Sequence, residues 1–162
     1  ARNMFSMRFG NVDVSQKSLT ELMSMEGRRV QKTYSDLANK YFVQWGGRAY
    51  TPGKFNLSDL TNKLITAGNA ALYALVSAVI HALGLSPRIG FVHSGSPLPF
   101  VYDIADLYKE ELVFDMAFEL TAKMAGVYNR YTAIDEFKNR VINAKFMERC
   151  PADIIKLLRL KS

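Results

Sequence analysis

The sequence is poor in cysteine and in long hydrophobic runs, and each shortage excludes a class of protein. Cys150 is the only cysteine, so no disulfide can form within the chain, which favours a reducing, cytoplasmic setting. The longest uncharged stretch, 64–87, is divided by polar residues and glycines into apolar runs shorter than the roughly 18 residues that cross a bilayer. No charged segment followed by an apolar one opens the chain, as a secretory signal would require. We therefore expect this stretch to belong to a buried core helix, and we expect no membrane association.

Positive charge is what the sequence has in excess. The 162 residues carry a net charge of +6, and 49% of them are hydrophobic, which is enough for one domain with a sizeable core. Residues 1–100 hold eleven Lys and Arg against five Asp and Glu, whereas residues 101–162 hold ten of each. The basic excess in the first hundred residues favours a polyanionic partner.

Apolar residues recur at helical spacing through most of the chain, and β-like alternation is confined to short stretches at 41–50 and 88–93. The pattern predicts a mainly α fold in which several helices pack around a central apolar one. A helical pattern that starts at Ala1 without a cap suggests that this single domain is a fragment of a longer protein. The predicted helices, in chain order, cover about 15 or 17 to 41, about 57–83 with Asn56 or Ser58 as the cap, about 101–125, and 128–160 as one or two helices broken near Pro151.

The first long helix carries an acidic residue on its predicted buried face. Its inward stripe is predicted, in chain order, as Leu19, Leu22, Met23, Glu26, Val30, Tyr34, Leu37 and Tyr41. Burying the Glu26 carboxylate costs several kcal/mol, in order of magnitude, unless a cation or hydrogen-bond donors compensate it. Gly27 beside it lowers the helix propensity by roughly 1 kcal/mol relative to Ala, which suggests that another backbone or a ligand approaches closely there.

The third predicted helix repeats the anomaly with Asp103 and Asp106. Its inward line is predicted to contain Glu110, Val113, Ala117, Leu120 and Met124 and to continue back through both aspartates. If the helix begins near Val101, its macrodipole stabilises each aspartate by about 0.3–1 kcal/mol, so simple capping would also account for them.

His93 precedes Asp103 by ten residues, in the Pro- and Gly-rich connector 86–100, so the two side chains must lie near each other. Glu, His and Asp from three segments form a mixed oxygen and nitrogen set that suits a divalent metal. A buried ion-pair network is an equally strong alternative, in which the carboxylates are neutralised by Arg28, Arg29 and Arg48. Spacing alone leaves both interpretations open.

The segments that carry these residues resemble a known family. Met25–Val30, Leu57–Leu85 and above all Gly90–Asp106, with the sequence GFVHSGSPLPFVYDIAD, are similar to the α-helical C-terminal domain of the CRISPR-associated integrase. The similarity is greatest to the type I-E branch and runs in register from about Arg2 to Glu119. The Glu-Gly, His-Ser-Gly and Asp-Ile-Ala-Asp elements are specific together, although each alone is weak.

The resemblance implies a site and partners. It implies that Glu26, His93 and Asp106 coordinate a catalytic Mg²⁺ or Mn²⁺ and that Asp103 supports them, with Tyr73 and Tyr102 close by. It also implies a homodimer, a small adaptor subunit, and an N-terminal β domain that this chain lacks. The basic residues expected to hold DNA by its phosphates are Arg28, Arg29, Lys32, Arg48 and Lys54.

The expected activity is metal-dependent phosphodiester transesterification, in which the 3′-hydroxyl of a prespacer is joined to the CRISPR repeat. The main alternative is a non-catalytic helical nucleic-acid-binding or assembly module, in which the acidic residues are structural. A hydrolase of small phosphoesters is a second alternative, which the basic excess disfavours.

Overall fold

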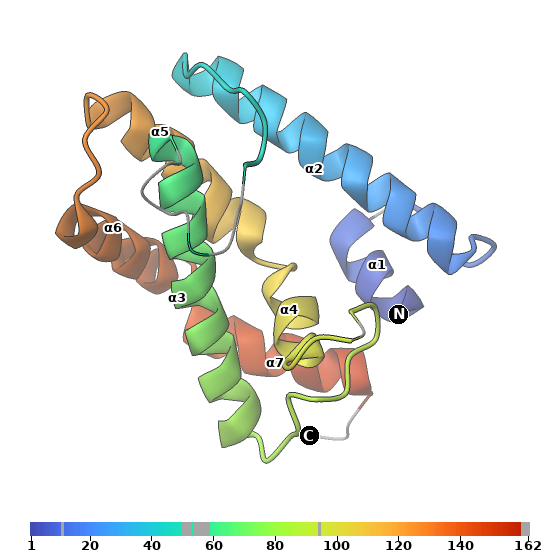
Figure 1. The fold of residues 1–162 in the computed structure, drawn as a ribbon. Helices are drawn as coiled ribbons and strands as arrows, with labels where there is room; N and C mark the ends of the chain where they lie inside the picture. Colours follow the sequence, from blue (N-terminus) through green and yellow to red (C-terminus); the bar gives the residue numbers. More distant parts are fainter. Residues whose placement is uncertain (11, 50–52, 54–58, 94, 160–162) are drawn as a thin grey trace.

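The described part of the chain is helical and contains no strand (Figure 1). The computed structural model describes residues 1–10, 12–49, 53, 59–93 and 95–159. The fold is mainly α, as predicted, and the β-like stretches at 42–49 and 88–93 are irregular. The elements, in chain order, are α1 (Arg2–Phe9), α2 (Leu19–Tyr41), α3 (Leu60–Ala82), α4 (Pro99–Ala105), the π-helix (Glu110–Phe114), α5 (Asp115–Lys123), α6 (Arg130–Asn143) and α7 (Phe146–Leu158).

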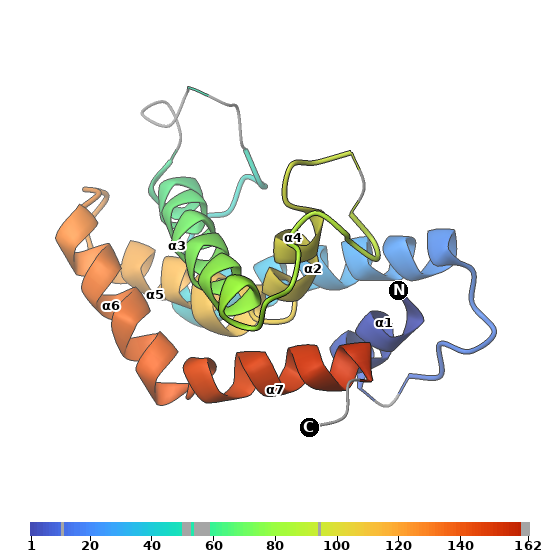
Figure 2. The same cartoon turned by 90° about the horizontal axis from the view of Figure 1, so that it is seen from below.

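Helix α3 is the centre on which the other elements pack. It contacts α4, α5, α6, α7 and the π-helix, and it buries ten of its own residues, including Leu64, Leu72 and Ile80. By length and composition it could cross a bilayer, but the core helix of a soluble protein passes the same test. Both views place α1 and α6 at opposite ends of the molecule, with α3 between them (Figures 1 and 2). The predicted central apolar helix is therefore confirmed.

Side-chain caps set where the two long helices begin. Helix α2 starts after Ser18, whose hydroxyl accepts from the Glu21 N–H while the Glu21 carboxylate accepts from the Ser18 N–H at 2.7 Å. Helix α3 starts three residues later than predicted because Asp59 caps it, accepting from the Asn62 N–H at 2.8 Å. The caps predicted at Asn56 and Ser58 lie outside the described residues.

Only part of the predicted inward stripe of α2 is buried. Leu22, Glu26 and Leu37 are buried, whereas Leu19 and Met23 are about half exposed, so the prediction for those two residues is wrong. The reason is that α2 extends past the central core at its N-terminal end. There Leu22 packs only with a small satellite cluster that contains Phe5 of α1 and Val14.

The third predicted helix is wrong as a single element. Helix α4 ends at Ala105, a turn follows, and the chain continues through the π-helix, which closes with an Asp115 N–H to Glu110 carbonyl hydrogen bond, into α5. The break predicted near Pro151 is also wrong, because that proline lies inside α7. The chain instead turns at Lys145, which has a left-handed φ of 49°.

Aromatic packing fixes the segment that follows α2. The Trp45 ring lies 5.0 Å from that of Tyr34 on α2 and 5.1 Å from that of Phe118 on α5, measured between centroids. Tyr34 also contacts Phe114 of the π-helix at 4.8 Å. This cluster holds the segment 42–49 against the core and thereby positions Arg48 beside the site described next.

Candidate active site

A buried carboxylate organises the connector that precedes α4. Asp103 is fully buried and accepts hydrogen bonds from the backbone N–H groups of Phe91, Val92 and His93, the last two at 3.1 and 3.0 Å. The same carboxylate also bonds Nδ1 of the His93 ring at 2.7 Å. Asp103 therefore fixes both the backbone and the ring of the residue that the sequence marks as a metal ligand.

These contacts set the charge states of the pair. Hydrogen bonding to Asp103 raises the pKa of His93, although burial acts in the opposite direction. Burial tends to raise the pKa of Asp103, but His93 and the three backbone donors hold it below its ordinary value. Because Nδ1 is engaged, Nε2 of His93 is the nitrogen that remains to face the site, and it lies 3.9 Å from Oδ2 of Asp106.

A glycine makes room for this arrangement. A Cβ at Gly90 would lie 2.6 Å from the His93 carbonyl oxygen, 2.6 Å from Cβ of Pro99 and 3.0 Å from Oδ2 of Asp103. Real Cβ atoms do not come so close to backbone. At Gly90, therefore, the connector lies too close to α4 to leave room for a side chain.

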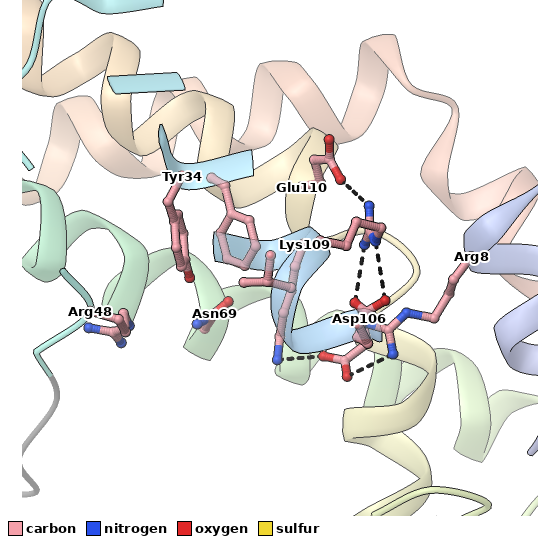
Figure 3. Close-up of a pocket in the computed structure, with 11 residues that line it drawn as sticks. Arg8, Tyr34, Arg48, Asn69, Asp106, Lys109 and Glu110 are labelled. Atoms are coloured by element: carbon pink, nitrogen blue, oxygen red, sulfur yellow. Dashed lines mark hydrogen bonds and ion pairs between the residues drawn. The ribbon is translucent and has the colours of Figure 1, made fainter. Parts of the chain in front are cut away.

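Two carboxylates from distant elements meet at one arginine. The guanidinium of Arg8 from α1 bonds Glu26 of α2 through Nη2, and it bonds Asp106, the residue directly after α4, through Nη1 at 3.3 Å. The Arg8 side chain is 5% exposed, so this is a buried ion-pair triad. Figure 3 shows Arg8 reaching across from α1 to Asp106.

Two further cations hold the outer side of the same carboxylates. Arg29 bonds Glu26 at 3.1 Å through Nε and also bonds Glu110, while Nζ of Lys109 lies 2.6 Å from Oδ1 of Asp106. Burial acts to lower the pKa of Lys109, but Asp106 and the neighbouring Tyr73 raise it above its ordinary value. All these carboxylates therefore face cations.

A cavity of about 260 Å³ opens beside the triad and is lined in part by Asn69, Tyr34 and Arg48 (Figure 3). A second cavity of about 520 Å³ adjoins it and is lined by residues that include His93, Arg48 and Lys109. Tyr73 and Tyr102 form its aromatic wall, with their ring centroids 4.9 Å apart. Charged, polar and aromatic groups thus converge on two adjoining hollows.

The structure brings together the side chains singled out from the sequence. Glu26, His93, Asp103 and Asp106 belong to one continuous network of hydrogen bonds and ion pairs. The capping interpretation of the aspartates is wrong, because α4 begins at Pro99 and both lie toward its C-terminal end, where the helix dipole disfavours negative charge. The close approach expected at Gly27 is not made by the described chain, since no atom of it lies within 4 Å of a Cβ placed there.

The network has the form of the ion-pair alternative. Within the ranges that the structure describes, no three His, Cys, Asp or Glu side chains are arranged to hold a metal ion. The donor types nevertheless suit one, because two carboxylates and an imidazole with an available Nε2 are present. In the place of a metal ion, the guanidinium of Arg8 joins the two carboxylates.

The basic residues expected to hold DNA lie in different environments. Arg28 and Lys32 are exposed on α2, and Lys32 pairs with Asp36 at 2.6 Å. Arg29 is half-buried and engaged by Glu26 and Glu110. Arg48 bonds Asn62 and Thr66 at 2.7 and 3.0 Å and lines both cavities. Lys54 lies outside the described residues.

Sequence reasoning missed Arg8 and Lys109. Lys109 had a local signal, since it follows Asp106 by one helical turn. Arg8 had none, because α1 ends at Phe9 and α2 begins only at Leu19, so helical periodicity does not relate Arg8 to Glu26. Only the tertiary fold brings α1 against α2.

The family model for CRISPR associated protein Cas1 matches residues 7–141 of this chain. The chain is 50% identical over 161 residues to CRISPR-associated endonuclease Cas1 2 of Chlorobaculum tepidum, covering 99% of this chain and 54% of the relative. It is 43% identical over 129 residues to CRISPR-associated endonuclease Cas1 of Escherichia coli K12, covering 80% and 42% respectively. The chain thus spans about half the length of these curated relatives.

Solved structures agree in fold. The protein in the crystal structure of a TtCas1–DNA complex superposes with a TM-score of 0.86 at 31% identity, covering 98% of this chain and 58% of that one. A structure of TM1797, a CAS1 protein from Thermotoga maritima, superposes with a TM-score of 0.72 at 20% identity, which supports the fold alone. The resemblance found in the sequence is confirmed, and the chain belongs to the Cas1 family of CRISPR-associated proteins.

Proposed function

We propose that this chain is the helical catalytic part of a nuclease that integrates DNA into CRISPR repeats in the cytoplasm, using Mg²⁺ or Mn²⁺. The observation that carries the proposal is that Glu26, His93 and Asp106, from three separate segments, belong to one network of ion pairs and line two adjoining cavities. Relatives named as endonucleases and the solved complex of TtCas1 with DNA support it. DNA, a second copy of the intact protein and a small adaptor subunit are its proposed partners.

Glu26, His93 and Asp106 would hold the cation, which, when bound, would polarise the scissile phosphate and offset the negative charge of the transition state. Asp103 positions His93 so that Nε2 faces Asp106. Arg48 and Lys109, which line the larger cavity, hold the phosphates of the bound strand, and Tyr73 and Tyr102 offer ring surfaces to its bases.

The reaction we propose is a transesterification. The 3′-hydroxyl oxygen of the incoming strand forms a bond to phosphorus, and the bond between phosphorus and the 3′ oxygen of the repeat strand breaks. The attacking hydroxyl loses its proton to solvent, and the departing 3′ oxygen gains one. No covalent bond to the protein forms, and the number of phosphodiester bonds is unchanged.

The test is the substitution Glu26→Gln in the intact protein. We expect cleavage of branched DNA and strand transfer in the presence of Mn²⁺ to fall by more than about 100-fold, because loss of a ligand exceeds the 10- to 100-fold cost typical of outer-shell partners. DNA affinity should stay nearly unchanged. Asp36→Asn is the matched control, since it removes a carboxylate from the exposed face of the same helix.

A second function is favoured by the complete pairing of the carboxylates with Arg8, Arg29 and Lys109. In that case the chain is a non-catalytic nucleic-acid-binding or assembly module. Glu26→Gln would then lower the free energy of unfolding and leave the nuclease activity of the folded fraction equal to that of Asp36→Asn. That outcome would exclude the catalytic proposal.

A further inference from the structure

The most unusual group in the site is the buried guanidinium of Arg8. It joins two acidic side chains of different elements, and its Nε is buried without a hydrogen-bond partner in the part of the chain that the structure describes. We infer that Arg8 is a resident counter-cation, which holds Glu26 and Asp106 together until a divalent cation displaces it. This inference rests on the proposed metal-dependent function and adds a competitor that controls loading of the site.

The pairing of individual oxygen atoms carries the inference. Arg8 takes Oε1 of Glu26 and Oδ2 of Asp106, and Oδ2 is also the oxygen that faces Nε2 of His93 at 3.9 Å. The other oxygen of each carboxylate belongs to a different cation: Oε2 of Glu26 to Arg29 and Oδ1 of Asp106 to Lys109. Arg29 also reaches Oε1, at 3.2 Å through Nη2. Arg8 therefore holds Oε1 of Glu26 and Oδ2 of Asp106, which are the oxygens that a cation bound between the two carboxylates would take.

The local charge leads to the same conclusion. The groups that Arg8 joins are three carboxylates, Glu26, Asp106 and Glu110, and three cations, Arg8, Arg29 and Lys109, so their charges balance. Asp103 adds one further carboxylate, on the far side of the His93 ring. Adding a divalent cation while Arg8 stays would leave an excess of positive charge in a largely buried place, which is costly. Departure of Arg8 removes one positive charge, frees Oδ2 of Asp106, and leaves Oε1 of Glu26 with the 3.2 Å contact to Arg29 alone.

Arg8 can leave without unfolding α1. Met4 and Phe5 are fully buried and anchor the helix, so the movement required is a rotation of the long arginine side chain rather than release of α1. Meanwhile Arg29 and Lys109 keep their oxygens and continue to hold both carboxylates in place. Arg8 therefore lowers the affinity for the cation but keeps the carboxylates converged while the cation is absent.

The experiment is calorimetric titration of MnCl₂ into the intact protein and its Arg8→Gln variant, without DNA. We expect Arg8→Gln to bind Mn²⁺ about tenfold more tightly or better, within the range usual for coupling between two ligands. In EDTA the same variant should unfold at a lower temperature than the wild type, because two buried carboxylates then face each other with less compensation. Added Mn²⁺ should restore most of that loss.

Arg28→Gln is the matched control. It removes the same charge from an exposed position of α2 next to the site, so it measures the general electrostatic effect on cation binding. Arg8→Lys retains the charge with a single ammonium and is expected to bind Mn²⁺ with an affinity between those of the wild type and Arg8→Gln.

The outcomes separate this inference from the proposed function. If Arg8→Gln binds Mn²⁺ no more tightly than Arg28→Gln, while Glu26→Gln abolishes binding, Arg8 is a structural partner and the competition is refuted although the metal site stands. If Mn²⁺ binding that depends on Glu26 is absent from the wild type but present in Arg8→Gln, the competition is supported in its strongest form. If neither protein binds Mn²⁺ in a manner sensitive to Glu26, both proposals fail.

Discussion

At the scale of single residues, the site depends on groups that leave space as much as on groups that carry charge. Asp103 can receive three backbone N–H groups and the ring of His93 only because Gly90 places no side chain between the connector and α4. Gly27 is the opposite case, since it is exposed in the middle of α2 and no atom of the described chain lies near the place of its missing Cβ. The two glycines therefore predict substitutions of opposite sign.

Gly90→Ala should lower the free energy of unfolding by about 1–3 kcal/mol, the usual cost of overpacking, because the new Cβ meets the His93 carbonyl and Pro99 at 2.6 Å. The nuclease activity should fall as well, since His93 must move. Gly27→Ala should raise the free energy of unfolding by up to about 1 kcal/mol, the difference in helix propensity. Urea unfolding of the intact protein measures both, and a Gly90→Ala protein as stable as Gly27→Ala would contradict the role given to Gly90.

At the scale of elements, periodicity predicted the long regular helices well and failed where the helix type changes. The end of α2 at Tyr41 and the course of α3 followed from apolar spacing and from glycine, whereas 101–125 has the pattern of one helix. A π-turn inserts one residue without removing the apolar pattern on either side, so the spacing of Val113 and Ala117 gives no sign of it. The contacts of Arg8 depend on the packing of α1 and could not be obtained from spacing at all.

Helix α6 is joined to α5 by one arginine. Arg140 bonds Asp115 at 2.7 Å and Glu136 at 2.9 Å and also pairs with Glu119. Burial tends to raise the pKa of Asp115, but hydrogen bonds from Lys40, Arg140 and Tyr41 hold it below its ordinary value. A carboxyl group with a lowered pKa stabilises the fold above its unfolded pKa, near about 4, and loses that contribution as the pH falls below it.

Arg140→Gln should therefore lower the free energy of unfolding by roughly 1–3 kcal/mol at pH 7, since partly buried carboxylates lose their partner. The difference from the wild type should shrink below about pH 4, as Asp115 takes up a proton in both proteins. Arg149→Gln is the control, because Arg149 is nearly half exposed in its pair with Glu111 and its loss should cost no more than about 1 kcal/mol. A difference that is constant down to about pH 2.5 in chemical denaturation, well below the ordinary pKa of an aspartate, would argue against the role given to Asp115.

At the scale of the whole molecule, the two halves of the chain differ in how their charges are used. The basic excess lies in residues 1–100, which supply α1, α2 and Arg48 on the cavity side. The balanced remainder supplies α5, α6 and α7, where Arg140 of α6 pairs with Asp115 and Glu119 of α5. Composition alone indicated the uneven charge, but only the fold shows that the site draws on both parts of the chain, with Arg8 and Glu26 from the first hundred residues and Asp106 and Lys109 from the remainder.

The single cysteine reports whether α7 detaches from the core. Cys150 of α7 is fully buried in the main core, and burial raises the pKa of its thiol to about 12. At pH 8 only about one thiol in ten thousand is then ionised, and the ionised form is the one that alkylating reagents attack. Iodoacetamide should leave Cys150 unmodified in the folded intact protein and modify it rapidly in concentrated urea, as measured by mass spectrometry of its peptide. Because exposure of Cys150 requires α7 to leave α3, the labelling rate at intermediate urea should follow global unfolding, and rapid labelling in native buffer would show that α7 detaches independently.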